Sequence, residues 1–492
     1  MAVQPLVEEI RTSPSAPEAF EHLRERPFSF FLDSGMDPQK SRLPRFHRGR
    51  DSELGRYSFM GSDPFLVVRS RGQEITLLRV NGKREVLSGN PFDVVEGLLD
   101  QYRLDETPSP VPLIGGAVGY FSYDLCHFIE RLPSTAIDDL QLPECYLGFY
   151  DAVVAFDHLE GRAYIVSTGF PETEENKRRS RATARLKELK ATLATLFPRM
   201  SENSAYAESL TRGGTLLHSN FTREGYLRAV QTAREYIIAG DIFEVNLSQR
   251  FDAQLSIPPY ELYQRLRHIN PAPFASYLNF DRVTVVGASP ERFLRLKGDW
   301  VQTRPIKGTR RRGANPAEDE ALARELQNSI KDRAENVMIV DLERNDLGRV
   351  CRYGTVKVTE LWLLEVFPTV FHLTSTIEGR LRPDKTRIDL LKACFPGGSI
   401  TGAPKVRSME IIDELEPTKR SVYTGSIGYL SFNGEMDLNI VIRTFLVKDG
   451  KAYFQVGGAV VYDSDPEAEY IETLDKARAL IAALNLAEGG PY

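Results

Sequence analysis

Four turn signals, each lying between β-patterned runs, constrain the fold of this chain more than any other sequence feature. Asn81–Gly82, Asn433–Gly434 and Asp449–Gly450 are residue pairs typical of tight hairpins, and Glu160–Gly161 turns a fourth pair of runs. The runs around them, as in "FLVVRSRGQEITLLRVNGKREVL", are rich in residues that favour strands. Hairpins join antiparallel neighbours. The pattern therefore predicts large antiparallel sheets in both halves of the chain.

Helical patterns interrupt these strands. A charged segment at 172–197 carries a row of leucines on one side, namely Leu186, Leu189, Leu193 and Leu196. Further helices are predicted at 222–239 and 317–345. A final helix begins at "SDPEAEY", where Ser464 or Asp465 can cap it and Pro466 suits the first turn. Strands and helices in this arrangement predict an α+β protein.

The chain divides at a polar stretch. Residues 201–219 bear Gly and Ser and predict a linker between an N-terminal region, 1–200, and a C-terminal region, 220–492. In the second region, "ASYLNF", "VTVVGAS" and "FLRLKGDWVQT" suggest a meander. Near the C-terminus, "GSIGYLSFNGEMDLNIVIRTFLVKDGKAYFQVGGAV" predicts three strands.

Composition excludes several classes of function. The chain has 492 residues, 42% of them apolar and 26% charged, with a net charge of −6, so no overall basic field attracts nucleic acid. No apolar run has the roughly 18–20 residues that cross a membrane, and the N-terminus does not resemble a secretory signal. The four cysteines are far apart and show no metal-ligand spacing. We expect a cytoplasmic protein with free thiols.

Two predicted helices each carry acids three residues apart. "IKDRAENVM" places Asp332 and Glu335 on neighbouring turns, and "AEYIETLDK" does the same with Glu469 and Glu472. Carboxylates from two helices that meet at one point can hold Mg²⁺, which prefers oxygen ligands. Acids at this spacing also commonly line a solvated helix face, so the pattern alone leaves both interpretations open.

Three other features carry possible chemistry. The segment "FPGGSITGAPKVRSMEIIDELEP" (395–417) is a glycine-rich turn that leads into a helix. Such a turn can bind a small anion such as a carboxylate, or it can be an ordinary capped turn. It lacks the spacing of an ATP-binding loop. Arg443 either points to solvent from a strand or binds a carboxylate with its planar fork. His372, on an apolar segment, is typical of a core histidine when considered singly.

Lys307 stands in the arginine-rich loop "TRPIKGTRRRG". Free lysine has a pKa of about 10.4 and is protonated at neutral pH, so it cannot act as a nucleophile. We expect burial and the neighbouring Arg304 and Arg310 to lower its pKa by a few units. By itself, the pattern is also typical of a solvated loop cation.

Taken together and in order, "RPIKGT", "KDRAENVMIVDLERNDLGRV", "FPGGSITGAPK", "GSIGY" and "DPEAEYIETLDKA" resemble the chorismate-utilising enzymes. That family includes the anthranilate, aminodeoxychorismate and isochorismate synthases. The resemblance covers about residues 222–485, and "FLDSG" and "RYSFMGSDP" extend it to the first half. It implies a two-layered α/β sandwich with an Mg²⁺-dependent active site in the cleft between the layers.

The resemblance also implies roles for individual residues. Glu335 and Glu472 match the principal Mg²⁺ ligands, with Asp332 and Glu469 as neighbours that act directly or through water. Glu291 matches a general acid/base near the C4 hydroxyl of chorismate, and His372 matches a histidine beside the ring. The residues that match substrate-binding positions are Ser399, Thr401, Gly402, Tyr423, Arg443, Gly457 and Gly458.

Lys307 separates the groups within the family. The anthranilate synthases usually have alanine at this position, whereas the aminodeoxychorismate synthases have lysine, whose amine is thought to attack C2 of chorismate before ammonia adds at C4. Glu244 stands where water-adding relatives carry lysine and amine-adding relatives more often carry glutamine. The resemblance thus implies amination to 4-amino-4-deoxychorismate, on the way to 4-aminobenzoate and folate. An anthranilate synthase component and a non-catalytic binding scaffold are the alternatives.

Two further expectations follow from the family. No glutamine amidotransferase signature surrounds any cysteine, so the resemblance implies that a separate glutaminase subunit supplies ammonia. The stretch "FLDSG", which contains Ser34, resembles the start of a pocket that binds tryptophan in relatives.

Overall fold

The computed structural model describes residues 4–10, 15–35, 54–104, 109–194 and 217–484, and within these ranges the strands form two 12-stranded sheets. The strands of the first sheet are, in spatial order, β1 (Leu6–Ile10), β10 (Arg162–Ser167), β9 (Ala152–Asp157), β3 (Tyr57–Gly61), β2 (Phe30–Asp33), β13 (Phe274–Phe280), β14 (Val283–Ser289), β23 (Thr444–Lys448), β24 (Lys451–Val460), β12 (Glu244–Gln254) and β11 (His218–Ser219), with β20 (Gly402–Ala403) beside β12. Those of the second sheet are β17 (Ile306–Arg311), β19 (Val370–Arg380), β16 (Trp300–Arg304), β15 (Arg292–Lys297), β22 (Met436–Asn439), β21 (Ser426–Ser431), β7 (Gly116–Phe121), β8 (Cys145–Tyr150), β4 (Leu66–Arg71), β5 (Glu74–Arg79) and β6 (Arg84–Ser88), with β18 (Lys357–Val366) beside β19.

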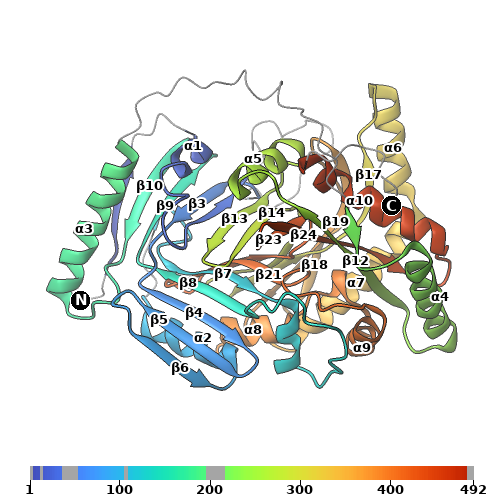
Figure 1. Ribbon diagram of the computed structural model, residues 1–492, viewed down its shortest axis with the longest axis horizontal. Coiled ribbons are helices and arrows are strands. Elements are labelled where there is room, and N and C mark those ends of the chain that lie inside the picture. The colour runs from blue at the N-terminus through green and yellow to red at the C-terminus, as the bar shows by residue number, and fades with distance from the viewer. Residues whose placement is uncertain (1–3, 11–14, 36–53, 105–108, 195–216, 485–492) are drawn as a thin grey trace.

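Helices cover the outer sides of the sheets, as Figure 1 shows. The α-helices are α1 (Ala16–Phe20), α2 (Pro91–Gln101), α3 (Glu175–Ala194), α4 (Arg223–Ala239), α5 (Pro259–Ile269), α6 (Pro316–Asn328), α7 (Ile330–Gly348), α8 (Arg387–Cys394), α9 (Lys405–Leu415) and α10 (Pro466–Ala483). Short 3₁₀ turns cover Tyr123–Phe128 and Gly398–Ile400. α3 lies at one end of the molecule, and α4, α6 and α10 lie at the other.

The predicted class and hairpins are confirmed. The protein is α+β, and its strand ladders are antiparallel throughout, as in β5–β6 around Asn81–Gly82 and β23–β24 around Asp449–Gly450. The last helix begins as expected, because the Asp465 side chain accepts from the Ala468 backbone N–H and Pro466 occupies the first turn.

The N-terminal and C-terminal regions share both sheets. β2 pairs with β13 in the first sheet, and β7 pairs with β21 in the second. The division at residue 200 is therefore not a division between sheets. The proposed linker lies mostly outside the described residues, as does Leu196, and its end at 218–219 forms the short strand β11.

Three predictions of local structure are wrong. The suggested meander is split, because β13 and β14 belong to the first sheet and β15 and β16 to the second, with the crossing at Pro290–Glu291. The single helix at 317–345 is two helices, since Ser329 ends α6 and caps α7. The three C-terminal strands are four, and the chain crosses between the sheets at 440–443.

Two hydrophobic layers hold the molecule together. One core contains side chains of both sheets, among them Phe30, Val118 and Tyr150. A second core lies under α1, α3, α5 and α10, where the predicted leucine row of α3 buries Leu186, Leu189 and Leu193 against the first sheet. In β2, Phe30 belongs to the first core and Phe31 to the second, as the alternation of side chains along a strand requires.

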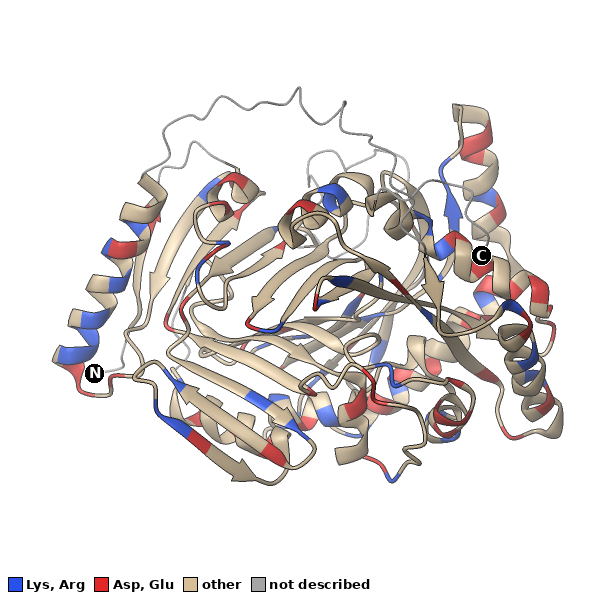
Figure 2. Ribbon diagram, viewed as in Figure 1, with Lys and Arg blue, Asp and Glu red and all other residues tan. Residues whose placement is uncertain are grey.

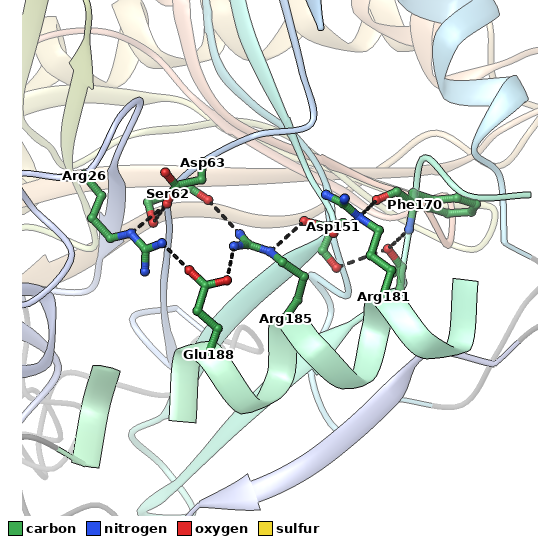
Figure 3. A network of polar contacts seen from close by, with 9 residues as sticks. Arg26, Ser62, Asp63, Asp151, Phe170, Arg181, Arg185 and Glu188 are labelled. Carbon is green, nitrogen blue, oxygen red and sulfur yellow. Dashed lines mark hydrogen bonds and ion pairs between the residues drawn. The ribbon is translucent and has the colours of Figure 1, made fainter. Parts of the chain in front are cut away.

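An ion-pair network, here called the α3 network, fixes α3 to the first sheet (Figure 3). The buried Asp151 carboxylate accepts from the side chains of Arg181 (2.8 Å) and Arg185 (3.3 Å). Arg185 also donates to Glu188 (2.6 Å), which in turn pairs with Arg26. The members of the α3 network are Arg26, Asp63, Asp151, Arg181, Arg185 and Glu188.

Charged residues lie mainly on the peripheral helices, while the strands of the inner sheets are mostly uncharged (Figure 2). Within the described ranges, no helix combines the length and apolarity that a membrane span requires. Cys126, Cys145, Cys351 and Cys394 are all free and buried.

Candidate active site

A cavity of about 640 Å³ opens where the two sheets approach α7 and α10. Its wall combines strands β17 and β19 of the second sheet, strand β24 of the first sheet and the two crossings between the sheets at Pro290–Glu291 and 440–443. Most of the residues predicted for the site line it, namely Glu291, Lys307, Asp332, Glu335, His372, Ser399, Tyr423, Arg443, Gly457 and Glu472. Side chains from segments up to 181 positions apart in sequence, Glu291 to Glu472, thus face one space.

Lys307 reaches the cavity because strand β17 bulges. The pairing of β17 with β19 shifts between Ile306 and Thr309, so Lys307 and Gly308 fall in the irregular part. Gly308 has φ +86°, and a Cβ there would lie 3.0 Å from Asp332, so a glycine is required both for the backbone conformation and for contact with α7. Bulges re-aim side chains next to active sites. This explains why a lysine is followed by glycine in the "PIKGT" loop.

The Lys307 ammonium is held by a buried carboxylate. Nζ donates to Oε1 of Glu244 at 2.6 Å, and the two residues are 7% and 0% exposed. Burial works to lower the pKa of Lys307, but the negative charges of Glu244 and Glu335 raise it above its ordinary value. The lysine is therefore protonated in this state of the site.

The expectation that Arg304 and Arg310 lower the pKa of Lys307 is wrong. Arg304 pairs with Glu365 at 2.6 Å, and Arg310 pairs with Asp332 at 3.0 Å and Glu325 at 2.8 Å. Their charges are thus largely offset by acids of their own. A sequence shows the arginines around Lys307 but not the carboxylates that neutralise them.

Glu291 occupies the first crossing between the sheets, directly after Pro290. Its Oε1 accepts a hydrogen bond from the Ser399 hydroxyl at 2.6 Å and from the Ile306 backbone N–H at 3.4 Å. Burial raises the pKa of Glu291 to about 7, against the smaller opposing effects of these hydrogen bonds and of Lys307. A carboxylic acid with this pKa is able to donate a proton near neutral pH.

Arg443, His372 and Tyr423 line the cavity near the second crossing. Arg443 is not within a strand as predicted but between β22 and β23, with φ +53°, and its Nη1 donates to the Lys476 carbonyl at 2.7 Å. Burial lowers the pKa of His372 to about 4, with Arg443 adding to the effect, so the ring is neutral at physiological pH. Burial raises the pKa of Tyr423 to about 12. These side chains offer a fixed cation and two neutral polar groups.

The acids of α7 and α10 approach one another from opposite sides of the cavity. Lys331 Nζ lies 3.8 Å from Glu335 and 4.0 Å from Glu469, and Lys476 Nζ pairs with Glu472 at 2.6 Å. Among the described residues, no group of three or more His, Cys, Asp or Glu side chains is gathered closely enough to form a preorganised metal cage.

The donor chemistry nevertheless fits a hard cation. Oε1 of Glu335 and Oε2 of Glu469 are buried and accept no hydrogen bond, which leaves two carboxylate oxygens open to a metal. A Cβ on Gly458 would lie 3.0 Å from Oε2 of Glu469 and 3.6 Å from Oε1 of Glu472, so the glycine backbone fits closely against both acids. Asp332 is instead engaged by Arg310.

The remaining predicted residues lie outside or behind this wall. Thr401 is fully buried and donates to the carbonyls of Gly397 and Gly398, and Gly402 has φ +137° where β20 pairs with β12. A Cβ on Gly402 would lie 2.1 Å from the Glu244 carbonyl oxygen. Both residues therefore shape the strand that carries Glu244. Gly457 lines the cavity and its carbonyl accepts from Lys476, while Gly458 and Glu469 lie just behind the lining.

Ser34 does not line this cavity. It is buried at the end of β2, its backbone N–H donates to Ser58, and its own hydroxyl makes no hydrogen bond. The neighbouring Leu32 and Asp33 line a separate cavity of about 70 Å³ together with Tyr57 and Phe274. Tryptophan binding at this place stays a prediction.

Sequence reasoning missed the lysines that hold the acids. Lys331 lies four residues before Glu335 in α7, and Lys476 lies four residues after Glu472 in α10. Each lysine therefore lies on the same helix face as its acid. The i,i+4 spacing is the signal that could have identified them. Glu244 was noted only as a departure from the family, and its pairing with Lys307 joins residues 63 positions apart.

Comparison with known proteins identifies relatives of this chain. The model of a family described as chorismate binding enzyme matches residues 56–482. The anthranilate synthase component 1 of Acetivibrio thermocellus is 42% identical over 88% of this chain and 87% of its own length. The aminodeoxychorismate synthase component 1 of Bacillus subtilis (strain 168) is 40% identical over 88% and 90%. The crystal structure of anthranilate synthase component I from Streptococcus pneumoniae TIGR4 superposes with a TM-score of 0.74 and 34% identity, covering 87% of this chain and 92% of that one.

Proposed function

The chain belongs to the chorismate-binding enzymes, and we propose that it converts chorismate to 4-amino-4-deoxychorismate. Overall identity does not choose between the two activities named among its relatives, since 42% and 40% are nearly equal. The observation that carries the proposal is the position of Lys307, a buried primary amine that a bulge directs into the same cavity as the protonatable Glu291.

In the proposed reaction, Arg443 and Tyr423 bind the enolpyruvyl carboxylate, and Ser399 with the loop of Thr401 and Gly402 supports the ring carboxylate. The neutral Lys307 amine attacks C2 of the ring while Glu291 donates its proton to the departing C4 hydroxyl. Ammonia then adds at C4 and displaces Lys307, which leaves the enolpyruvyl group in place. His372, neutral beside Thr309 at 2.9 Å, contributes shape and polarity near the ring rather than a charge.

We infer that Mg²⁺ is the cofactor, held by Glu335 and Glu472 with Asp332 and Glu469 beside it. The oxygens of Glu335 and Glu469 that accept no hydrogen bond support this assignment. When bound, the ion polarises the ring carboxylate of the substrate and offsets negative charge that develops on the ring.

We infer that ammonia comes from a separate glutaminase. Hydrolysis of glutamine by a cysteine needs an accessible thiolate. All four cysteines of this chain are buried, and burial raises the pKa of each thiol above its ordinary range. None of them is suited to that reaction, which supports a partner subunit of the glutamine amidotransferase class.

The proposal is tested by incubating the purified protein with chorismate, Mg²⁺ and ammonium. We expect 4-aminobenzoate only after aminodeoxychorismate lyase is added, and mass spectrometry should find a substrate adduct on the peptide that contains Lys307. Lys307→Ala should lower turnover by about 10³-fold or more, whereas Lys448→Ala, which removes a half-buried lysine that donates to the Leu140 carbonyl, should not.

Anthranilate synthesis is the second candidate function. The ion pair with Glu244 favours it, because a lysine that stays protonated acts as a cation and not as a nucleophile. Direct formation of anthranilate and pyruvate without added lyase would establish this alternative and reject the first.

A further inference from the structure

The Lys307–Glu244 ion pair joins the two sheets at the base of the cavity. Glu244 is the first residue of β12 in the first sheet, and Lys307 lies in β17 of the second. The position of Glu244 is fixed by its backbone, since the strand pairs with β20 at Ala403 and the Glu244 carbonyl accepts from the Ser408 hydroxyl at 2.9 Å. The 2.6 Å contact between the two side chains is therefore part of a rigid frame.

This pair creates a difficulty for a nucleophilic lysine. The acids that act on the Lys307 ammonium are Glu244 from β12, Glu335 from α7 and Glu291 from the first crossing, with Glu472 from α10 also coupled to it. All of them favour the charged amine while they are ionised. Two other lysines lie near these acids: Lys331 lies near Glu335 and Glu469, and Lys476 pairs with Glu472. The negative charges of these acids thus oppose loss of the Lys307 proton to bulk water.

A proton acceptor already lies in contact with the amine. Oε1 of Glu244 receives the hydrogen bond from Nζ, while Oε2 of the same carboxylate is buried and accepts no hydrogen bond. An ionised carboxylate that lacks donors is poorly stabilised where water is excluded. Transfer of one proton along the existing hydrogen bond converts two buried ions into a neutral amine and a neutral acid, and removes that desolvation cost.

We propose that Glu244 is a catalytic residue that takes the proton from Lys307 before the amine attacks the substrate and returns it when the amine leaves. This inference rests on the proposed function, because it assigns a partner to the nucleophile of that reaction.

The proton balance closes over one cycle. Glu244 accepts a proton from Nζ, the Nζ lone pair forms a bond to C2, the ring double bonds shift, and the C4–O bond breaks as Glu291 supplies the proton that makes water. Ammonia then forms a bond to C4, the double bonds shift back, and the C2–N bond breaks to release the amine. Lys307 regains its proton from Glu244, and the new C4 ammonium returns one to Glu291. The net change is chorismate plus ammonia to 4-amino-4-deoxychorismate plus water.

The competing role for Glu244 is purely structural, holding the lysine in place and keeping it charged. The two roles differ in pH dependence. If the proton moves within the pair, the number of protons on the pair does not change, and the rate of adduct formation is independent of pH on the acid side. If the proton must leave to solvent, the rate falls by about tenfold for each pH unit of acidification.

The test is rapid-quench mass spectrometry of the adduct on the Lys307 peptide, with Mg²⁺ and chorismate saturating, no ammonium, and pH varied from about 5.5 to 8. For the natural protein we expect a rate that changes less than about twofold between pH 6 and 7 and falls above pH 7 as Glu291 ionises. Glu244→Gln keeps the side-chain size but cannot accept the proton. Its rate should drop about fivefold from pH 7 to pH 6, because a tenfold loss of neutral amine is partly offset by protonation of Glu291. Glu244→Asp should be slower at all pH values and keep the shape of the natural profile.

Either of two results would overturn the proposal: Glu244→Gln forming the adduct at pH 6 as fast as the natural protein, or a natural profile that itself falls about fivefold or more from pH 7 to pH 6. If Glu244→Gln does not fold, the natural profile and Glu244→Asp decide the question. The proposed function fails in a different way, with no adduct in the natural protein at any pH and full turnover in Lys307→Ala.

Discussion

The α3 network and the acids of the cavity solve the problem of buried charge in opposite ways. In the α3 network, both oxygens of Asp151 accept from arginines and both oxygens of Glu188 do so as well, with Arg26 also bound to Asp63 at 2.7 Å. In and just behind the cavity wall, Glu244, Glu335 and Glu469 each keep one buried oxygen that accepts no hydrogen bond. These three residues are called the cavity acids below.

The different hydrogen bonding of the two groups indicates different roles: the charges of the α3 network stabilise the fold, and those of the cavity acids take part in binding or reaction. A buried ion pair whose members are fully hydrogen bonded is costly to break, since removing one partner strands the other. A buried carboxylate with a free oxygen is costly to keep. The cavity acids therefore reduce the stability of the folded protein in exchange for binding or proton transfer, whereas the α3 network holds a helix and offers nothing for a substrate to bind.

The sharpest way to break this comparison is Glu335→Gln. We expect turnover at limiting Mg²⁺ to fall about 10³-fold, equivalent to about 4 kcal/mol, because one of the metal-binding carboxylates becomes a neutral amide. Without Mg²⁺ the unfolding midpoint should be unchanged or higher, since a buried charge is gone. Magnesium titrations of activity, combined with thermal unfolding in chelator, give both values. Full activity at low Mg²⁺ would contradict the ligand assignment.

Asp151→Asn should show the reverse pattern. The change leaves Arg181 and Arg185 without their shared charge, and we expect the free energy of unfolding to fall by about 3 kcal/mol. Turnover per folded molecule should stay within about twofold of the natural protein, because the side-chain partners of Asp151 described by the structure, Arg181 and Arg185, do not line the cavity. Urea unfolding and steady-state rates, measured at a temperature where the variant is folded, check the two halves. A large loss of turnover would show that the two regions are coupled.

Stability should also depend on pH with opposite sign for the acids next to the cavity and for Glu188 of the α3 network, although burial also raises the pKa of Asp151 in that network above its ordinary value. Burial raises the pKa of Glu291 to about 7 and that of Glu343, next to it, to about 8, so their contribution is present below about pH 4.5 and is lost as the pH rises through 7 to 8. For Glu188, burial raises the pKa but Arg26 and Arg185 outweigh it and lower the value, so its contribution is lost as the pH falls.

Glu343→Gln isolates this effect. Between pH 5.5 and 8.5 the natural protein should lose about 3 kcal/mol more unfolding free energy than the variant, because only the natural protein must ionise Glu343, whereas Glu291 ionises in both. Glu188→Gln is the matched control and should leave the difference between these two pH values almost unchanged. Parallel pH dependence in the natural protein and Glu343→Gln would show that Glu343 does not titrate in this range.

The elements formed by local sequence signals were predictable. The glycine-containing turns predicted the hairpins, and Asp465 with Pro466 predicted the start of α10. The leucine row predicted the buried face of α3. Two of the wrong predictions, the meander and the C-terminal strands, share a physical cause. Strand patterning shows that a segment is extended but not which sheet it joins, so the crossings at Pro290–Glu291 and 440–443 were read as ordinary turns or continuous strand.

For the site, the ordered motifs identified the residues but not their partners. Asp332 pairs with Arg310, and Lys307 pairs with Glu244, so the pKa of Lys307 is raised and not lowered. The sequence does not show these ion pairs because they join distant segments. The break at Ser329 was also missed, since its hydroxyl caps α7 through a geometry that a single serine in a helical pattern does not reveal.

The shared sheets described above have a consequence for how this protein can be divided. β13 and β21, from the second half of the chain, are each completed by a strand from the first half. A fragment that starts after residue 216 would present two open backbone edges to water, which favours association with other chains. Two separately expressed halves should therefore regain activity only by assembling with each other. The C-terminal half depends on the N-terminal half to complete its sheets, even though all residues proposed to act on chorismate lie in the C-terminal half.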